Sequence, residues 1–222
     1  MSVSVEAVVF DLDGVLLDSE QLWNEAKREL VVAAGGRWRE DAPRAMIGMS
    51  SPEWSAYLHD ALEVDLPLDE INRQVVARMA SLYRARLPLL PGAVEAVRGL
   101  AARWPLGLAS SSNREIIDLA LSLAGVADSF DATVSSEEVA HGKPAPDVYL
   151  EACRRLGVSP ARSIAVEDSS NGLRSASAAG MAVIAVPNPH YPPDPDALDL
   201  AAATIDSLRA LAVGLVERVF EQ

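Results

Sequence analysis

The chain has 222 residues, half of them hydrophobic, and its 19 basic residues against 32 acidic ones give a formal net charge of −13. This balance disfavours binding to nucleic acid or to an anionic membrane surface, and the single cysteine, Cys153, excludes an intrachain disulfide. The length suits one domain with an elaboration, or two small domains.

The first predicted element is a strand over Val5–Phe10, which is nearly all apolar, as expected of a strand covered on both faces. It ends abruptly at two acids, Asp11 and Asp13, with one residue between them. Ser19 is then expected to cap a helix that runs to residue 34 and stops at two glycines. The sequence therefore delivers two like charges to the end of a buried strand.

A helical stretch follows. Ser51-Pro52-Glu53 is a helix start signal with proline at the first helical position, and it predicts a helix over about 52–62. Residues 69–86 carry a further long helical pattern. The whole segment 19–86 is thus predicted to be helical, without a strand signal.

Beyond residue 90, strands and helices alternate. Strands are expected over 106–110, 132–134, 163–167 and 182–186, and helices over 91–103, 114–123, 147–156, 171–179 and after Asp206. Such alternation implies a parallel doubly wound sheet with right-handed crossovers. The predicted fold class is α/β: a Rossmann-like core of residues 1–17 and 88–222, interrupted by an α-helical cap domain over 18–87.

Ligands of open α/β sheets bind at the carboxyl ends of the strands. The residues expected at that edge are Asp11, Asp13, Ser110, Glu167 and Asp168, joined by Lys143, one of only two lysines in the chain. Clustered carboxylates raise one another's pKa unless a cation lies among them, and oxygen ligands of this kind suit Mg²⁺. Together with a lysine, a serine hydroxyl and strand-end N–H groups, they describe a phosphate-binding site.

Other interpretations of this pattern are weaker. A calcium loop that begins at Asp11 would need a bidentate glutamate at its twelfth position, which is Leu22, and a strand before it is the wrong context. The chain contains neither a G-x-G-x-x-G after its first strand nor a G-x-x-x-x-G-K-[ST], so dinucleotide and P-loop sites are disfavoured.

The conjunction of motifs resembles the haloacid dehalogenase superfamily, in the branch with a helical cap after the first strand. "DLDGVLLDSE", "LAS", "GKPAPDVYLEA" and "VEDSSNG" are similar to its four motifs in order, and the likeness covers essentially the whole chain. The resemblance implies that Asp11 is a nucleophile that forms an aspartyl-phosphate, and that Asp13 is the general acid and then the general base. It further implies that Ser110, Ser111 and Lys143 bind the phosphoryl group. Mg²⁺ would be bound by Asp11, the Asp13 carbonyl and Asp168, with Glu167 beside it.

The second aspartate favours phosphoryl transfer, because the dehalogenases and phosphonatases of the superfamily generally lack it. A phosphatase and a mutase of the β-phosphoglucomutase type remain as alternatives. The mutase pattern has a cap histidine, a cap arginine and a lysine where Trp23, Ser51 and Asn113 stand here, although Arg114 could partly compensate. These departures favour a phosphatase of small phosphomonoesters, and "DSEQLW" resembles the sugar-phosphate phosphatases.

The cap is expected to set specificity through Trp23 and the turn 47–51, which includes Ser50 and Ser51. A hypothesis of another class is a phosphoreceiver signalling domain, but its acidic pair precedes the phosphate-accepting aspartate, whereas Glu167 and Asp168 follow Asp11. We expect a cytoplasmic protein, a monomer or weak homodimer, whose partner is a small phosphorylated metabolite rather than nucleic acid or membrane.

Overall fold

The computed structural model describes residues 4–220, and its centre is a parallel sheet of six strands in the order β3-β2-β1-β4-β5-β6. The strands are β1 (Ala7–Phe10), β2 (Leu106–Ser110), β3 (Ala132–Ser135), β4 (Ser163–Glu167), β5 (Ala182–Ala185) and β6 (Ala203–Thr204). The order reverses beside β1, as in a doubly wound fold, so the predicted fold class is confirmed.

Helices cover both faces of this sheet. They are α5 (Ala93–Ala101), α6 (Arg114–Ala124), α7 (Asp147–Leu156), α8 (Ser170–Ala178), α9 (Pro195–Leu198) and α10 (Val213–Phe220). Alternate residues of β1 enter different cores: Val8 and Phe10 pack with α5, α6 and α10, whereas Val9 packs with α7, α8 and α9. Burial on both faces explains why β1 reads as a continuous apolar run.

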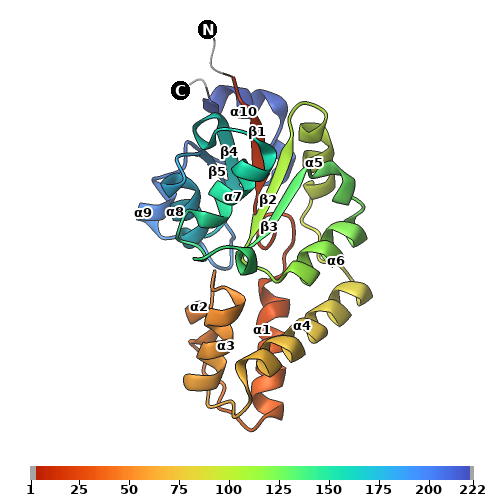
Figure 1. Cartoon of the computed structure of the whole chain (residues 1–222), viewed down its shortest axis with the longest axis vertical. Helices are drawn as coiled ribbons and strands as arrows, with labels where there is room; N and C mark the ends of the chain where they lie inside the picture. Colours follow the sequence, from red (N-terminus) through yellow and green to blue (C-terminus); the bar gives the residue numbers. More distant parts are fainter. Residues whose placement is uncertain (1–3, 221–222) are drawn as a thin grey trace.

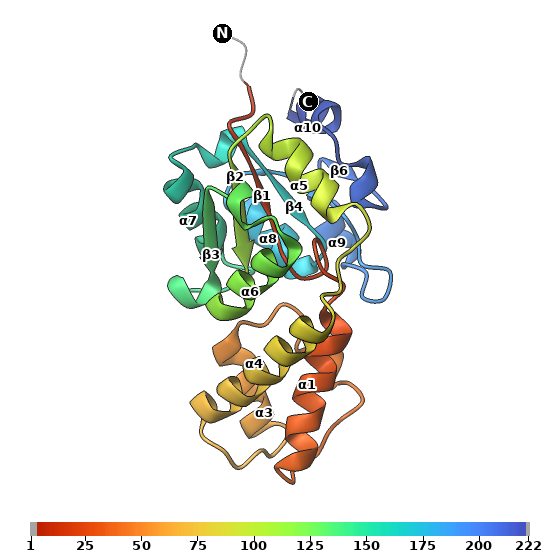
Figure 2. The ribbon, with the colours of Figure 1, turned by 90° about the vertical axis from the view of Figure 1, so that its right-hand side faces the viewer.

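The remaining helices gather beyond the carboxyl ends of the strands (Figures 1 and 2). They are α1 (Glu20–Ala33), α2 (Ala42–Ala45), α3 (Ser51–Asp60) and α4 (Leu68–Ala85). The chain enters and leaves this cap along adjacent paths, because Leu17 and Leu89 form an antiparallel bridge and the Leu90 N–H donates to the Leu16 carbonyl at 2.9 Å. The helical insert is therefore attached at one place, next to the carboxyl edge of the sheet.

Some local expectations were wrong. Ser19 lies before α1, but its side chain makes no capping hydrogen bond and donates to Asp13 instead. The short elements α2, α9 and β6 were not predicted, and the last helix begins only at Val213. None of the helices within residues 4–220 is long and apolar enough to span a bilayer.

Candidate active site

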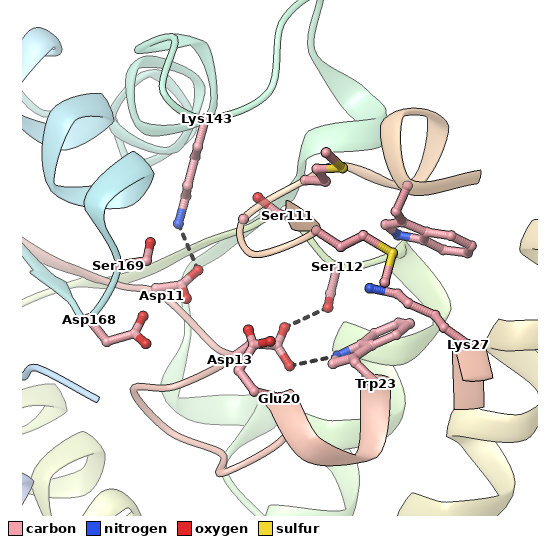
Figure 3. Close-up of a pocket in the computed structure, with 14 residues that line it drawn as sticks. Asp11, Asp13, Glu20, Trp23, Lys27, Ser111, Ser112, Lys143, Asp168 and Ser169 are labelled. Carbon is pink, nitrogen blue, oxygen red and sulfur yellow. Dashed lines mark hydrogen bonds and ion pairs between the residues drawn. The ribbon is translucent and has the colours of Figure 1, made fainter. Parts of the chain in front are cut away.

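Parallel pairing brings the ends of β1 and β4 together. Phe10 pairs with Val166, and the Asp11 N–H donates to the Val166 carbonyl at 3.0 Å. Asp11 and Asp168, the residues just beyond these strands, consequently lie at one edge of the sheet (Figure 3). One oxygen from each of the carboxylates of Asp11, Glu167 and Asp168 can be chosen so that all three lie within 4.8 Å of one another.

Lys143 holds this acidic group together. Its Nζ lies 2.7 Å from Asp11 Oδ1 and 2.5 Å from Glu167 Oε1, and all three side chains are buried. Burial lowers the pKa of Lys143, but its ion pairs with Asp11 and Glu167 outweigh that cost and raise the pKa above its ordinary value. The lysine is therefore a fixed positive charge beside Asp11.

One lysine does not neutralise three carboxylates. Burial raises the pKa of Asp11 from 3.8 to about 8, with Glu167 and Asp13 adding to the effect and Lys143 opposing it. Burial and the charges of Glu167 and Asp11 raise the pKa of Asp168 as well. A divalent cation would remove this penalty, and a donor set made of carboxylate oxygens fits a hard ion of the Mg²⁺ type.

Glu167 differs from the other two acids because its oxygens already accept hydrogen bonds. Oε1 accepts from Lys143 and from the Tyr149 hydroxyl at 2.8 Å, and Oε2 accepts from the backbone N–H groups of Asp168 and Ser169 at 2.9 and 3.3 Å. Glu167 thus orients Lys143 and the turn after β4, and Asp168 retains more free oxygen for a cation.

Two glycines allow these carboxylates to pack so closely. A Cβ added to Gly14, which has a φ of +81°, would lie 1.9 Å from Asp168 Oδ2. A Cβ added to Gly172 would lie 1.9 Å from Glu167 Oε1. A side chain at either position would displace the acids of the site, so both glycines are required by close approach.

The Asp13 carboxylate faces the cap. Its Oδ1 accepts from the Ser19 hydroxyl, from Trp23 Nε1 at 3.1 Å and from the Tyr83 hydroxyl at 3.4 Å. Its Oδ2 accepts from Ser112 Oγ at 2.6 Å. Donors from α1, α4 and the loop after β2 therefore fix the orientation of Asp13.

Asp11, Asp13 and Asp168 line a pocket between the cap and the carboxyl edge, shown in Figure 3. Lys143, Ser111 and Ser112 also line it, whereas Ser110 is fully buried behind them and accepts from the Ser112 N–H at 3.0 Å. Ser111 Oγ is buried and has no hydrogen-bond partner among the described residues. A free hydroxyl at this position fits the expected phosphate site.

Of the cap-side parts expected to face substrate, Trp23 lines the pocket, as does the turn 47–51 through Gly48 and Met49. Ser50 is the N-cap of α3 and is engaged in a capping box with Glu53. The other three surround Glu137: Asn113 Nδ2 donates to it at 2.6 Å, the Arg114 N–H donates at 2.9 Å, and Ser51 Oγ lies at 3.5 Å. The structure brings these residues together at the junction of cap and core, away from the lining of the pocket.

Sequence reasoning missed several residues of the pocket, notably Glu20, Lys27, Ser112, Ser169 and Trp54. One available signal was the rarity of lysine, which was used for Lys143 but not for Lys27. The other was spacing, because positions 20, 23 and 27 lie on one face of a helix.

A family model described as haloacid dehalogenase-like hydrolase matches residues 5–180, which is most of the chain. The chain belongs to the haloacid dehalogenase-like hydrolases. This confirms the family that the four motifs resemble.

Curated proteins with similar sequences include hexitol phosphatase B of Escherichia coli, which is 34% identical over 92% of this chain and 93% of its own. The phosphorylated carbohydrates phosphatase of Thermotoga maritima is 34% identical over 80% and 82% of the two chains. Among solved haloacid dehalogenase-like structures, CbbY of Rhodobacter sphaeroides, a mutant in complex with xylulose-(1,5)-bisphosphate, is 28% identical. It superposes with a TM-score of 0.84 over 96% of this chain and 99% of its own.

Proposed function

We propose that the protein is a Mg²⁺-dependent phosphatase that hydrolyses small phosphomonoesters, sugar phosphates in particular, through an aspartyl-phosphate. The observation that carries this proposal is the pairing of buried Asp11 with Lys143 at 2.7 Å, next to an Asp13 held by four donors, in a pocket closed by a cap. The names of the two similar phosphatases support the substrate class.

In the proposed reaction, a carboxylate oxygen of Asp11 attacks phosphorus, and the bond from phosphorus to the ester oxygen breaks. Asp13 gives its proton to the leaving alkoxide, which departs as the alcohol. Asp13 then takes a proton from a water molecule that attacks the aspartyl-phosphate. This step releases inorganic phosphate and restores Asp11, so protons and phosphoryl oxygens balance over the cycle.

The other residues stabilise charge and position the phosphoryl group. Lys143 and the unpartnered hydroxyl of Ser111 offer donors to the phosphoryl oxygens, with Ser110 supporting the turn from behind and the Ser112 hydroxyl donating to Asp13. Asp11, Asp168 and the Asp13 carbonyl would hold Mg²⁺, and Glu167 would orient its surroundings. When bound, the ion would neutralise the acids and the developing phosphoryl charge.

The arrangement around Glu137 favours a phosphatase over a mutase. A mutase must hold a second, non-transferring phosphate with additional cations. At the corresponding positions, Asn113 donates to a carboxylate and Ser51 lies beside the same oxygen. The Arg114 guanidinium is engaged with Glu138 at 3.0 Å, Asp118 at 2.9 Å and Thr133 at 2.8 Å, so it offers little compensation. An acidic residue here would repel a second phosphate.

We further propose that residues 18–87 act as the cap that sets specificity and that 1–17 and 88–222 form the catalytic core. The adjacency of the two connecting segments at Leu17 and Leu89 supports this division. A phosphoreceiver is disfavoured because a cap covers the acidic edge, as an enzyme for small molecules requires.

The test is a screen of phosphorylated metabolites with inorganic phosphate as the readout, in Mg²⁺. We expect repeated turnover with sugar or sugar-alcohol monophosphates. Uptake of a single phosphate per chain without release would contradict the proposal and favour the receiver, and absence of phosphate release from every ester would refute it.

A further inference from the structure

One face of helix α1 turns three side chains toward the active site. Glu20, Trp23 and Lys27 are spaced by three and four residues, and all three line the pocket that contains Asp11 and Asp13. Figure 3 shows Lys27 reaching into this pocket from the cap side, opposite the catalytic aspartates. Trp23 donates a hydrogen bond to Asp13. Glu20 and Lys27, in contrast, have no role in the proposed reaction as described above.

Lys27 is a largely buried residue whose ammonium lines the pocket and has no acceptor among the described residues. Its residue is 6% exposed, and Nζ lies 5.5 and 5.3 Å from the ring centroids of Trp23 and Trp54. Within residues 4–220 it makes neither a hydrogen bond nor an ion pair. Indole faces stabilise the charge but leave the three N–H donors of the ammonium free to face the pocket.

Glu20 supplies the complementary group. Glu20 is half-buried and lines the pocket. Its carboxylate accepts no hydrogen bond from the described residues and is too far from the Lys27 ammonium to form an ion pair. Burial raises the pKa of Glu20 to about 7 and lowers that of Lys27 to about 8, with each charge partly offsetting the penalty on the other. A donor and an acceptor therefore face the same cavity without being joined.

We propose that Glu20 and Lys27 together bind a hydroxyl group of the leaving alcohol, which accepts a hydrogen bond from Lys27 and donates one to Glu20. The inference rests on the proposed phosphatase function and names the part of the substrate that the cap selects. One hydroxyl pairs with both groups at once, and the indole faces of Trp23 and Trp54 suit the C–H surface of a polyol.

The charges that face Lys27 argue against an anionic group in this place. Glu20 on its own helix and Asp13 from the loop after β1 are the acids that act on it, and Lys27 is the sole lysine or arginine of the cap segment that lines this pocket. A second phosphate or a carboxylate would meet one cation and two acids, whereas a neutral hydroxyl meets no net repulsion.

The experiment compares kcat/KM for a sugar-alcohol monophosphate with that for p-nitrophenyl phosphate, whose leaving group has no aliphatic hydroxyl. Lys27→Met and Glu20→Gln should each lower the ratio of the two values, by roughly 10- to 100-fold for the charged donor. The double variant should lose less than the product of the single losses, because both groups bind one hydroxyl. Arg28→Met, which removes an exposed cation from the same helix, is the matched control and should leave the ratio unchanged.

Each other outcome counts against the inference. An equal fall for both esters would assign Lys27 and Glu20 a structural role, and a wild-type preference for bisphosphates or phosphocarboxylic acids that disappears in Lys27→Met would assign an anion site. Should Lys27→Met fail to fold, the ratio in the half-exposed Glu20→Gln decides by itself. Wild-type protein that hydrolysed neither ester would instead refute the proposed phosphatase function.

Discussion

The indole Nε1 of Trp23 lies 3.1 Å from Oδ1 of Asp13. This contact joins the first helix of the cap to the acid that follows the proposed nucleophile by two residues. Ser19 and Tyr83 add cap-side donors to the same oxygen. The position of Asp13 therefore depends on where the cap lies, and opening the cap would remove the donors from α1 and α4 and leave Ser112 of the core.

The first prediction tests this dependence. Trp23→Phe keeps an aromatic ring but removes the N–H donor, so kcat for p-nitrophenyl phosphate should fall by roughly 3- to 10-fold through looser positioning of Asp13. Tyr83→Phe removes a longer contact at 3.4 Å and should cost less. A larger loss in Tyr83→Phe than in Trp23→Phe would contradict the order of importance proposed here.

The second prediction separates the two aspartates. Asp11→Asn should abolish both phosphoenzyme formation and turnover, because an amide cannot form the acyl phosphate. Asp13→Asn should lose turnover through the proton transfers, commonly a factor of roughly 10²–10⁴, while Mg²⁺ binding persists because its backbone carbonyl is unchanged. Steady-state phosphate release and titration with Mg²⁺ measure these effects, and substantial turnover by Asp11→Asn would exclude it as the nucleophile.

The third prediction concerns metal removal. Without a cation, burial and the charges of Glu167 and Asp13 raise the pKa of Asp11, which lowers the share of the nucleophilic carboxylate at neutral pH. Excess EDTA should therefore stop phosphate release, and Mg²⁺ should restore it. Mg²⁺ should also raise the thermal unfolding temperature of the wild type, and less so that of Asp168→Asn. Undiminished turnover in EDTA would rule out the metal assignment.

The fourth prediction concerns mutase activity. With Glu137 at the junction where a mutase would need cations, β-glucose 1-phosphate and catalytic glucose 1,6-bisphosphate should give free phosphate rather than rapid isomerisation. Loss of two charged contacts weakens retention of a bisphosphate by roughly two to four powers of ten. Both products are followed together, and glucose 6-phosphate formed much faster than phosphate would establish the mutase.

The fifth prediction is a pH dependence of stability. Burial raises the pKa of Glu20 from 4.5 to about 7 in the folded protein. The folded state therefore binds this proton more tightly than the unfolded chain, and the resulting stability, present below pH 4.5, is lost as the pH rises to about 7. Relative to Glu20→Gln, the free energy of unfolding of the wild type should decline by roughly 1–3 kcal/mol across that window. Denaturant titrations at pH 4.5, 6 and 7.5 measure this, and a constant difference would disprove the raised pKa.

The sheet could be predicted because its strands are strongly apolar and alternate with amphipathic helices, and the acidic edge because parallel strands end on the same side. The short elements α2, α9 and β6 carry too few residues for a periodic signal. The predicted role of Ser19 was wrong because a serine before a helix has two kinds of partner nearby. Its oxygen can accept from the backbone N–H groups of the helix, or its hydroxyl can donate to Asp13, as it does here. Which of these partners Ser19 takes depends on the tertiary structure around it.

The cap side of the site was less predictable for a related reason. The spacing of Glu20 and Lys27 places them on one helix face, but which face meets the pocket depends on how the cap docks on the core. The surroundings of Asn113 and Ser51 also depend on how the cap docks, because their partner Glu137 is distant in sequence. Contact of Asn113 and Ser51 with substrate stays a prediction. The exact limits of the cap, the cytoplasmic location and the oligomeric state also stay predictions.

The bridge between Leu17 and Leu89 has an evolutionary consequence. Because the chain returns to the sheet beside the point where it left, the intervening segment can lengthen, shorten or be exchanged between genes while β1, β2 and the acids beyond them stay in register. Selection can thus diversify the recognised alcohol in one segment while it preserves the phosphate chemistry in the other.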